Sequence, residues 1–253
     1  MRSNVLLSWY IHRMNALIMF FFVGCGPEVQ APSCESSEES ACFKGVFRTL
    51  LGQPVEGIQV CVLEDDEFPC VVTDELGQWK IPGLPLDTNV ALTAEHPDFV
   101  PSLFGQFTGM AWYDWYKVAI PKSIMSTNAN RLDLELDETK GNVLFLTWEG
   151  LNINGIDTAN VPDVVLTNAA DFDNVFYGDA LGLASTSQES TTGSGSGGIL
   201  NLPVGINVLH LESPFGECAK ESMFHYQSEN EGIPIPIRAG FTSAIDIICP
   251  ISE

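Results

Sequence analysis

Five consecutive residues carry the side chains best suited to binding chemistry, namely Trp112-Tyr113-Asp114-Trp115-Tyr116. Aromatic faces beside a carboxylate suit sugar rings, because the apolar C–H surface of a sugar stacks on the rings while its hydroxyls donate to the acid. The run lies in a long stretch between predicted strands, and loops on a rigid scaffold commonly carry binding residues. The alternative, which is the more common fate of large aromatics, is packing over an open sandwich end or a domain interface.

Metal-binding patterns are weak elsewhere in the chain. His210 and Glu212 are two residues apart on a predicted strand and so share a face, but such a pair is more often exposed than metal-bound. Asp171, Asp173 and Asp179 cluster in a predicted loop without the residue order of an EF-hand. We therefore predict no metal site, and keep weak calcium binding as the alternative to a solvated acidic loop.

Nucleotide binding and hydrolysis also lack a supporting pattern. Gly193, Gly195 and Gly198 satisfy the spacing GxGxxG, but Ser- and Thr-rich sequence precedes them and a strand pattern follows. A dinucleotide site needs a preceding strand and a following helix. The sequence contains no G-x-S-x-G or H-E-x-x-H motif. We predict a non-enzymatic protein without a cofactor, and a hydrolase is the remote alternative.

The first 24 residues indicate a targeting segment rather than part of a fold. They contain no acidic residue, and an apolar run over 16–23 follows His12 and Arg13. The run is shorter than the roughly 20 residues that span a bilayer, but it suits the apolar region of a signal peptide. A membrane anchor over 5–23 is the alternative, although it would place His12 and Arg13 inside the bilayer at a cost of a few kcal/mol.

The apolar run ends in Phe22-Val23-Gly24-Cys25, which resembles the lipobox of bacterial lipoproteins. The resemblance implies that Cys25 is lipidated and becomes the first mature residue, although Phe22 stands where the family usually has Leu. Gly26 follows in place of Asp, which implies the outer membrane in a Gram-negative host. Residues 25–41 then form an acidic tether rich in Ser and Pro. We predict a cell-envelope protein held by a lipid anchor.

The charge balance excludes a nucleic-acid partner. The 253 residues contain 11 Lys and Arg against 33 Asp and Glu, a net charge of −22, whereas phosphate binding needs clustered cations. Removing residues 1–24 takes away two Arg and leaves 9 − 33 = −24. Hydrophobic residues make up 45% and aromatics 10%, which is enough for packed cores rather than a disordered acidic chain.

The seven cysteines indicate disulfides once one of them is assigned to the lipid anchor. Six cysteines outside the cytoplasm permit fifteen pairings. Their spacing favours a hairpin pair, a C-terminal pair and a local N-terminal pair, which are Cys61–Cys70, Cys218–Cys249 and Cys34–Cys42. None has CxxC or zinc-finger spacing, so we predict a structural role.

The chain resembles itself at an offset of 118 residues. Seven identities fall in one ungapped window: Thr73, Gly77, Ile81, Leu84, Pro85, Asn89 and Val90 match Thr191, Gly195, Ile199, Leu202, Pro203, Asn207 and Val208. Shorter matches pair Lys44-Gly45 with Lys140-Gly141 at an offset of 96, and Leu132-Asp133-Leu134 with Ile245-Asp246-Ile247. A repeat of this size indicates tandem domains of about 100 residues.

Each half contains short strand patterns separated by Gly and Pro turns. In the first half we expect strands at 43–48, 57–63, 70–73, 78–81, 89–94 and 131–136. The last of these alternates apolar and charged residues over Leu132–Leu136. No segment predicts a long amphipathic helix. These features predict antiparallel β-sandwiches.

Two turn motifs connect the first half to a known family. Residues 52–60 have the pattern G-x-P-V-x-G-x-x-V, and residues 73–81 have T-D-x-x-G-x-W-x-I before Leu84-Pro85. With these motifs the segment 42–138 resembles the carboxypeptidase regulatory-like domain of the transthyretin (prealbumin) fold, a CNA-B-like β-sandwich. The second half keeps four of the motif residues but has Thr192 for the Asp and Gly197 for the aromatic.

The prediction is an all-β protein with a signal peptide at 1–24, a tether at 25–41 and two tandem transthyretin-like antiparallel β-sandwich domains at 42–138 and 139–253. The resemblance implies no carboxypeptidase chemistry, because the family's zinc peptidase domain is separate and absent here. The predicted role is binding or structural at the membrane surface, with the lipid anchor in the membrane and polysaccharide or another envelope protein as partner. A carbohydrate-binding module that uses Trp112–Tyr116 is the alternative.

Overall fold

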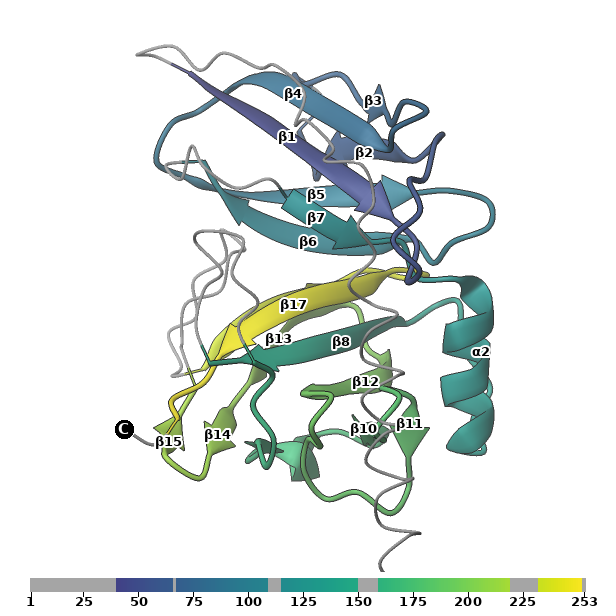
Figure 1. Cartoon of the computed structure of the whole chain (residues 1–253), viewed down its shortest axis with the longest axis vertical. Coiled ribbons are helices and arrows are strands. Elements are labelled where there is room, and N and C mark those ends of the chain that lie inside the picture. Colours follow the sequence, from purple (N-terminus) through teal and green to yellow (C-terminus); the bar gives the residue numbers. More distant parts are fainter. Residues whose placement is uncertain (1–39, 66, 109–114, 150–158, 219–231, 252–253) are drawn as a thin grey trace, which may run out of the picture.

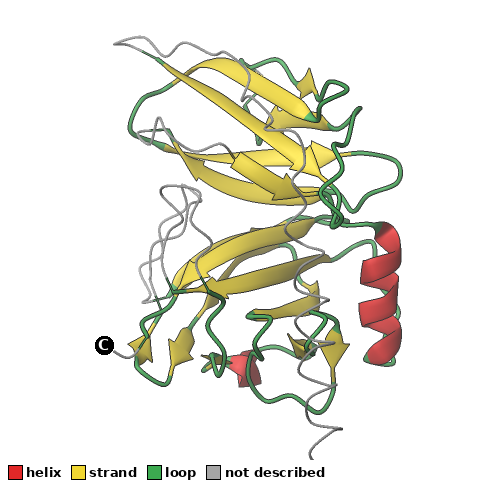
Figure 2. Cartoon of the chain, viewed as in Figure 1, coloured by secondary structure: helices red, strands yellow, loops and turns green. Residues whose placement is uncertain are grey.

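A computed structural model (Figure 1) describes residues 40–65, 67–108, 115–149, 159–218 and 232–251. Over these residues the chain is almost entirely β-structure, with one α-helix, α2 (Lys122–Arg131), and one short 3₁₀ turn, η1 (Ala169–Asp171) (Figure 2). The all-β prediction is confirmed. Within the described ranges no helix is long and apolar enough to cross a membrane.

The first sandwich consists of the strands β4-β1-β7 in one sheet, facing the strands β3-β2-β5-β6 of another. The rings of Phe47 and Trp79 both meet Phe104 edge to face in the core between them. The strand bounds are β1 (Ala41–Arg48), β2 (Gln59–Val62), β3 (Val71–Val72), β4 (Gln78–Leu84), β5 (Asn89–Glu95), β6 (Ser102–Phe107) and β7 (Trp115–Val118).

The second sandwich places β11-β10-β12-β8-β17 against two small sheets, β13-β16 and β15-β14-β9. Phe145, Ile199 and Ile235 are buried in its core. The bounds are β8 (Gly141–Trp148), β9 (Val165–Leu166), β10 (Val175–Gly178), β11 (Ala184–Ser185), β12 (Ser196–Leu202), β13 (Gly205–Leu209), β14 (Leu211–Ser213), β15 (Gly216–Glu217), β16 (Ile233–Ile237) and β17 (Thr242–Ile248).

The two sandwiches share one nine-stranded sheet, with the order β11-β10-β12-β8-β17-β6-β5-β2-β3. Figure 1 shows β17 between β8 and β6. The core of the second sandwich also extends to three buried side chains of the first half, Leu63, Ala91 and Leu103. Backbone pairing and apolar packing therefore join the halves, in addition to the chain that connects them.

Strand pairing is not wholly antiparallel as the sequence predicts. The last strand of each half lies parallel to the first, β7 beside β1 and β17 beside β8, and β17 is also parallel to β6. In the first half the chain reaches β7 from β6, which belongs to the opposite sheet, rather than through a hairpin. Hairpin geometry therefore does not set the direction of this strand.

The hydrogen bonds of the two halves repeat together with the sequence. The buried Thr73 hydroxyl accepts from the Ile58 amide at 2.9 Å and donates to the Val55 carbonyl at 2.8 Å. The buried Thr191 hydroxyl makes the same two bonds at 3.0 Å each, with Val164 and Val161. Each hydroxyl thus ties two backbone groups that have left the strand ladder.

We expect Thr73→Val to lower the free energy of unfolding by about 2–4 kcal/mol, because it leaves the buried Ile58 amide and Val55 carbonyl unpaired. Thr191→Val should cost about 1–3 kcal/mol, because it leaves the Val164 amide unpaired while the Val161 carbonyl still accepts from the Thr147 hydroxyl. The measurement is urea denaturation. Thr242→Val is the matched control, since the Thr242 hydroxyl is buried and has no hydrogen-bond partner. This control should be neutral or stabilising. Equal losses in all three variants would contradict the assignment.

Two of the shorter sequence matches are wrong. Phe43 faces Ile81 in the first half and Val143 faces Ile199 in the second, so β1 and β8 correspond at an offset of 143 − 43 = 100, not 96. The counterpart of β17 is β7, because each lies parallel to the first strand of its half. Residues 132–134 form no strand. Short matches of two or three residues do not fix an alignment across loops of different length.

The second half has no aromatic residue on β12 at the position of Trp79, but the neighbouring strand β8 carries one. Gly45 of β1 lies opposite Trp79 of β4, and a Cβ on Gly45 would lie 2.7 Å from the indole. In the second half Phe145 of β8 lies opposite Gly197 of β12, and a Cβ on Gly197 would lie 2.3 Å from the phenyl ring. Each core therefore holds one large ring over one glycine, with the strands exchanged.

The predicted strand at 131–136 is wrong, because Arg131 ends helix α2. The helix buries Met125 and Ala129 against side chains of β10, β11 and β12. Its apolar residues are too few for a visible amphipathic pattern, since polar Asn128 occupies the third buried position. After the helix, the alternation over 132–136 does predict which side chains are half-buried. The side chain of Asn201, rather than a strand, bonds this segment: it donates to Glu135 O at 2.8 Å.

Candidate functional site

The predicted aromatic cluster is described only at its end. Trp112, Tyr113 and Asp114 lie outside the described residues. Trp115 and Tyr116 begin β7, the terminal strand of the β4-β1-β7 sheet, and their backbone pairs with β1. Glycan binding by this cluster stays a prediction.

The disulfide predictions are confirmed for two of the three pairs. Cys61 bonds to Cys70 across nine residues, and Cys218 bonds to Cys249 across 31 residues. Cys42 is also disulfide-bonded. Its predicted partner, Cys34, and the predicted lipidation site, Cys25, lie outside the described residues.

The GxGxxG pattern forms a strand-to-strand turn, not a nucleotide loop. Gly195 has φ of 61°, and its N–H donates to Thr192 O at 2.8 Å before β12 begins. Gly77 makes the same bond to Asp74 O at 2.8 Å before β4. The predicted equivalence of the two turns is confirmed, and a strand occupies the place of the helix that phosphate binding needs.

The histidines do not converge on a site in the part of the chain that the structure describes. His210 interrupts the predicted strand, lying between β13 and β14, and its amide donates to Asn168 Oδ1 at 3.1 Å. His96 lies beside the Phe99 ring and lines a recess with room for about one water molecule. His225 lies outside the described ranges. Over the described residues no three His, Cys, Asp or Glu side chains are placed to hold a metal ion.

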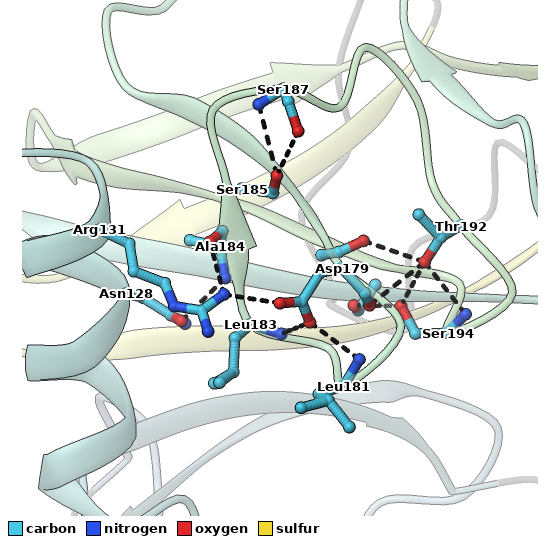
Figure 3. Close-up of polar contacts among 12 residues, drawn as sticks. Asn128, Arg131, Asp179, Leu181, Leu183, Ala184, Ser185, Ser187, Thr192 and Ser194 are labelled. Carbon is cyan, nitrogen blue, oxygen red and sulfur yellow. Dashed lines mark hydrogen bonds and ion pairs between the residues drawn. The ribbon is translucent and has the colours of Figure 1, made fainter. Parts of the chain in front are cut away.

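One polar cluster joins α2 to the β10–β11 hairpin (Figure 3). Arg131 Nη1 donates to Asp179 Oδ2 at 2.6 Å and to Ala184 O at 3.2 Å. Asn128 Oδ1 accepts from the Ala184 amide at 3.0 Å. Asp179 Oδ1 also accepts from two amides of the hairpin turn, Leu181 and Leu183. The cluster fastens the helix to the outer face of the second sandwich.

The Asp179 carboxylate accepts hydrogen bonds from three other members of this cluster. Partial burial alone raises its pKa, but hydrogen bonds from Arg131 and from the Leu181 and Leu183 amides outweigh burial and hold the pKa below its ordinary value. Asp171 and Asp173, its companions in the predicted acidic loop, are exposed around η1. The sequence shows the acids but not Arg131 as their partner, because 48 residues separate Arg131 from Asp179.

A second cluster lies where the two sandwiches meet. Lys117 of β7 lies 3.2 Å from Asp246 of β17, and the Trp148 indole N–H donates to the other Asp246 oxygen at 3.0 Å. Lys117 Nζ is also 5.7 Å from the centre of the Phe104 ring. Its members come from four strands, β6 and β7 of the first half and β8 and β17 of the second, so this cluster reinforces the shared sheet. The sequence offered no signal for it.

The Asp246 contacts make the stability of the junction depend on pH. Loss of part of its hydration raises the pKa of Asp246, but the Lys117 charge and the hydrogen bonds from Trp148 and Lys117 hold the pKa below its ordinary value. A carboxyl with a lowered folded pKa stabilises the fold above its unfolded pKa, and this contribution is lost as the pH falls through the folded pKa.

Asp246→Asn should therefore destabilise the protein at pH 7 and cost nothing at a pH below the folded pKa. The loss should stay under about 1 kcal/mol, because the carboxyl is 41% exposed. Urea denaturation of both proteins between pH 7 and 2 gives the difference. Asp173→Asn, at an exposed loop position, is the control. A difference that persists at the acid end would contradict the role of the charge.

Comparisons with known proteins give no family assignment. No protein-family model matches the chain, and no curated protein matches it. Among solved structures, it aligns with the Bacillus anthracis TIE protein at 13% identity and a TM-score of 0.23, covering 83% of this chain and 34% of that one. It aligns with a streptococcal ancillary pilin at 11% identity and a TM-score of 0.25, covering 85% and 63%. The chain thus spans about a third of the first protein and under two thirds of the second.

Proposed function

We propose that this chain is a non-enzymatic structural module of the cell envelope, held at the membrane through lipid on Cys25. The observation that carries the proposal is the nine-stranded sheet that the two sandwiches share. A structural module must keep its two ends at a fixed distance and orientation. Here backbone pairing, a common core and the Asp246 cluster join the two halves. The polar clusters hold elements of the chain together.

The first sandwich belongs, in this proposal, with carboxypeptidase regulatory-like domains of the transthyretin type. What supports the assignment is that the motif residues have the roles their chemistry predicts. Asp74 Oδ1 accepts from the Leu76 and Gln78 amides at 2.9 and 2.8 Å. Gly77 has φ of 74°, and Trp79 is buried in the core. The acidic segment before β1 would act as the tether between lipid and sandwich. It ends at residue 40 rather than at the predicted 41, because Ala41 begins β1 and is buried.

The anchoring test is membrane fractionation of the full chain in a Gram-negative host. Cys25→Ala should move the protein from the membrane to the soluble fraction, because the lipidated sulfur is lost. Phe22→Leu is the matched control, since it brings the lipobox closer to its usual form and should keep the protein in the membrane. Membrane retention of Cys25→Ala would contradict the anchor.

A carbohydrate-binding role is the second candidate, favoured by the position of Trp115 and Tyr116 on a strand at the end of its sheet. In this role Trp112, Tyr113 and Asp114 complete the surface. The test is a glycan array with the wild-type chain and a Trp112→Ala/Trp115→Ala variant. Binding that disappears in the variant supports the role, and binding that is unchanged removes these residues from it.

A further inference from the structure

The Cys61–Cys70 disulfide closes the outermost hairpin of the shared sheet. β2 and β3 pair at Gln59↔Val72 and Val60↔Val71, so the register places Cys70 opposite Cys61. β3 is the last strand of the sheet and has only two residues. The disulfide is therefore a principal bond that holds β3 at the sheet edge.

This disulfide is open to solvent, whereas the Cys218–Cys249 disulfide is not. Cys70 is exposed and Cys61 is half-buried, while Cys218 and Cys249 are 3% and 1% exposed. Thiol–disulfide exchange requires a thiolate to reach one of the sulfur atoms. A reductant can reach the hairpin disulfide in the folded protein, but it can reach the second only after that region opens.

Two anchors limit what opening the hairpin would disturb. On one side Leu63 is buried and its amide donates to Ala91 O at 2.8 Å. On the other side Thr73 is buried and bonds Ile58 through its amide and its hydroxyl. Between the anchors, the side chains that pack against the first core are only partly buried, namely Phe68 and Val71. The segment between Leu63 and Thr73 can therefore separate without loss of either core.

The charge of this segment selects the reductant. The sequence between the cysteines contains four consecutive acids over 64–67, and Glu64 and Glu67 are exposed. Negative charges close to a disulfide repel an anionic thiol and raise the energy of the thiolates formed. Glutathione, with its two carboxylates, is disfavoured relative to a dithiol that carries no such charge.

We propose that Cys61–Cys70 is a redox switch that releases the terminal strand of the shared sheet, and that its reductant is an uncharged or cationic dithiol. One thiolate of the dithiol attacks a sulfur of the pair, and a mixed disulfide forms. The second thiol of the reductant then displaces the protein sulfur. Two electrons and two protons pass to Cys61 and Cys70, which become thiols, and the dithiol becomes a disulfide. Release uncovers the backbone edge of β2. This inference does not depend on the proposed envelope function.

The first test follows reduction of the full oxidised chain by dithiothreitol under native conditions, with alkylation and mass spectrometry to identify free cysteines. Cys61 and Cys70 should become reactive at least about tenfold faster than Cys218 and Cys249, because access governs the rate. Equal rates for the two pairs would overturn the switch.

The second test measures amide hydrogen exchange before and after reduction. Exchange should increase at least about tenfold between Leu63 and Thr73 and stay unchanged in β4 and β12. A Cys61→Ser/Cys70→Ser variant should show the same pattern without reductant, which separates the loss of the bond from effects of the reagent. Unchanged exchange in the segment, or faster exchange throughout the first sandwich, would overturn the proposal of a local release.

The third test concerns the reductant. Glu64→Gln/Glu67→Gln should speed reduction by glutathione several-fold more than reduction by dithiothreitol, since the attacking thiolate is negative in both reagents but only glutathione adds carboxylates. Added salt should speed the glutathione reaction of the wild type in the same way. A glutathione rate that responds to neither change would overturn the charge selection.

Discussion

Gly77→Ala should be among the most damaging single substitutions in this protein, with a loss of about 3–4 kcal/mol in the free energy of unfolding. Gly77 has φ of 74°, which costs an L-residue energy, and a Cβ there would lie 2.3 Å from Phe47 O. That carbonyl accepts from the Val55 amide, and the Phe47 amide donates to Gly77 O. Relieving the clash therefore pulls apart the bonds that join β1 to the turn before β4.

The same loss is expected for Gly195→Ala, because a Cβ on Gly195 would lie 2.8 Å from Thr147 O at the equivalent turn. Gly83→Ala is the matched control. Gly83 has φ of 83°, but a Cβ there would meet no atom within 4 Å, so only the conformational cost of about 1–2 kcal/mol applies. Urea denaturation of the three variants separates the two effects. If Gly77→Ala lowers the free energy of unfolding no more than Gly83→Ala does, the contact between the new Cβ and Phe47 O does not contribute to the loss.

In the first core the glycine lies on β1 and the ring on β4, whereas in the second core the ring lies on the first strand and the glycine opposite it. We therefore expect substitutions at Gly45 and Trp79 to have strongly non-additive effects on the free energy of unfolding. Trp79→Gly should cost about 4 kcal/mol or more, because Trp79 is 2% exposed and its removal leaves a large cavity. Gly45→Phe alone should cost a similar amount, because the new side chain meets the indole. The double variant places the ring on β1, as Phe145 is placed on β8, and fills the space left by the indole.

The measurement is a double-mutant cycle by urea denaturation. The double variant should lose at least about 2 kcal/mol less than the sum of the single losses, since residues that share one space are not additive. The Trp79 indole N–H has no hydrogen-bond partner in the core, so the exchange breaks no polar contact. Additive losses would show that the side chains at positions 45 and 79 do not compete for the same space in the first core. Gly83→Ala combined with Trp79→Gly is the control for additivity, because Gly83 meets no neighbour.

Much of the local structure was predictable because short-range chemistry dictates it. The turn at Asp74–Gly77 follows from an acid that accepts turn amides and a glycine free to adopt positive φ. The two confirmed disulfides join cysteines whose spacing suggested them. The strand predictions in the first half succeeded up to residue 94, where alternation and turn residues agree.

The prediction failed where one segment depends on a distant one. The residues of α2 have little helical pattern of their own, and their contacts lie on β10, β11 and β12. Leu132, Leu134 and Leu136 alternate like a strand and are half-buried, but the side chain of Asn201 bonds this segment where a strand would need a pairing partner. Alternation indicates which face of a segment is buried, but it does not indicate which other segment buries it.

The all-β class, the repeated turns around Thr73 and Thr191, and the Cys61–Cys70 disulfide can be predicted from sequence, because each depends on residues close together along the chain or on a pattern of period two. The Cys218–Cys249 pair spans 31 residues, and its prediction came from the number and placement of the cysteines. Three other features became visible only in the folded chain: β17 lies between β8 and β6, Lys117 contacts Asp246, and the ring and the glycine of the two cores are exchanged between strands. These features depend on which strands become neighbours after folding. That choice is made by the packing of whole faces, and no single segment of the sequence contains it.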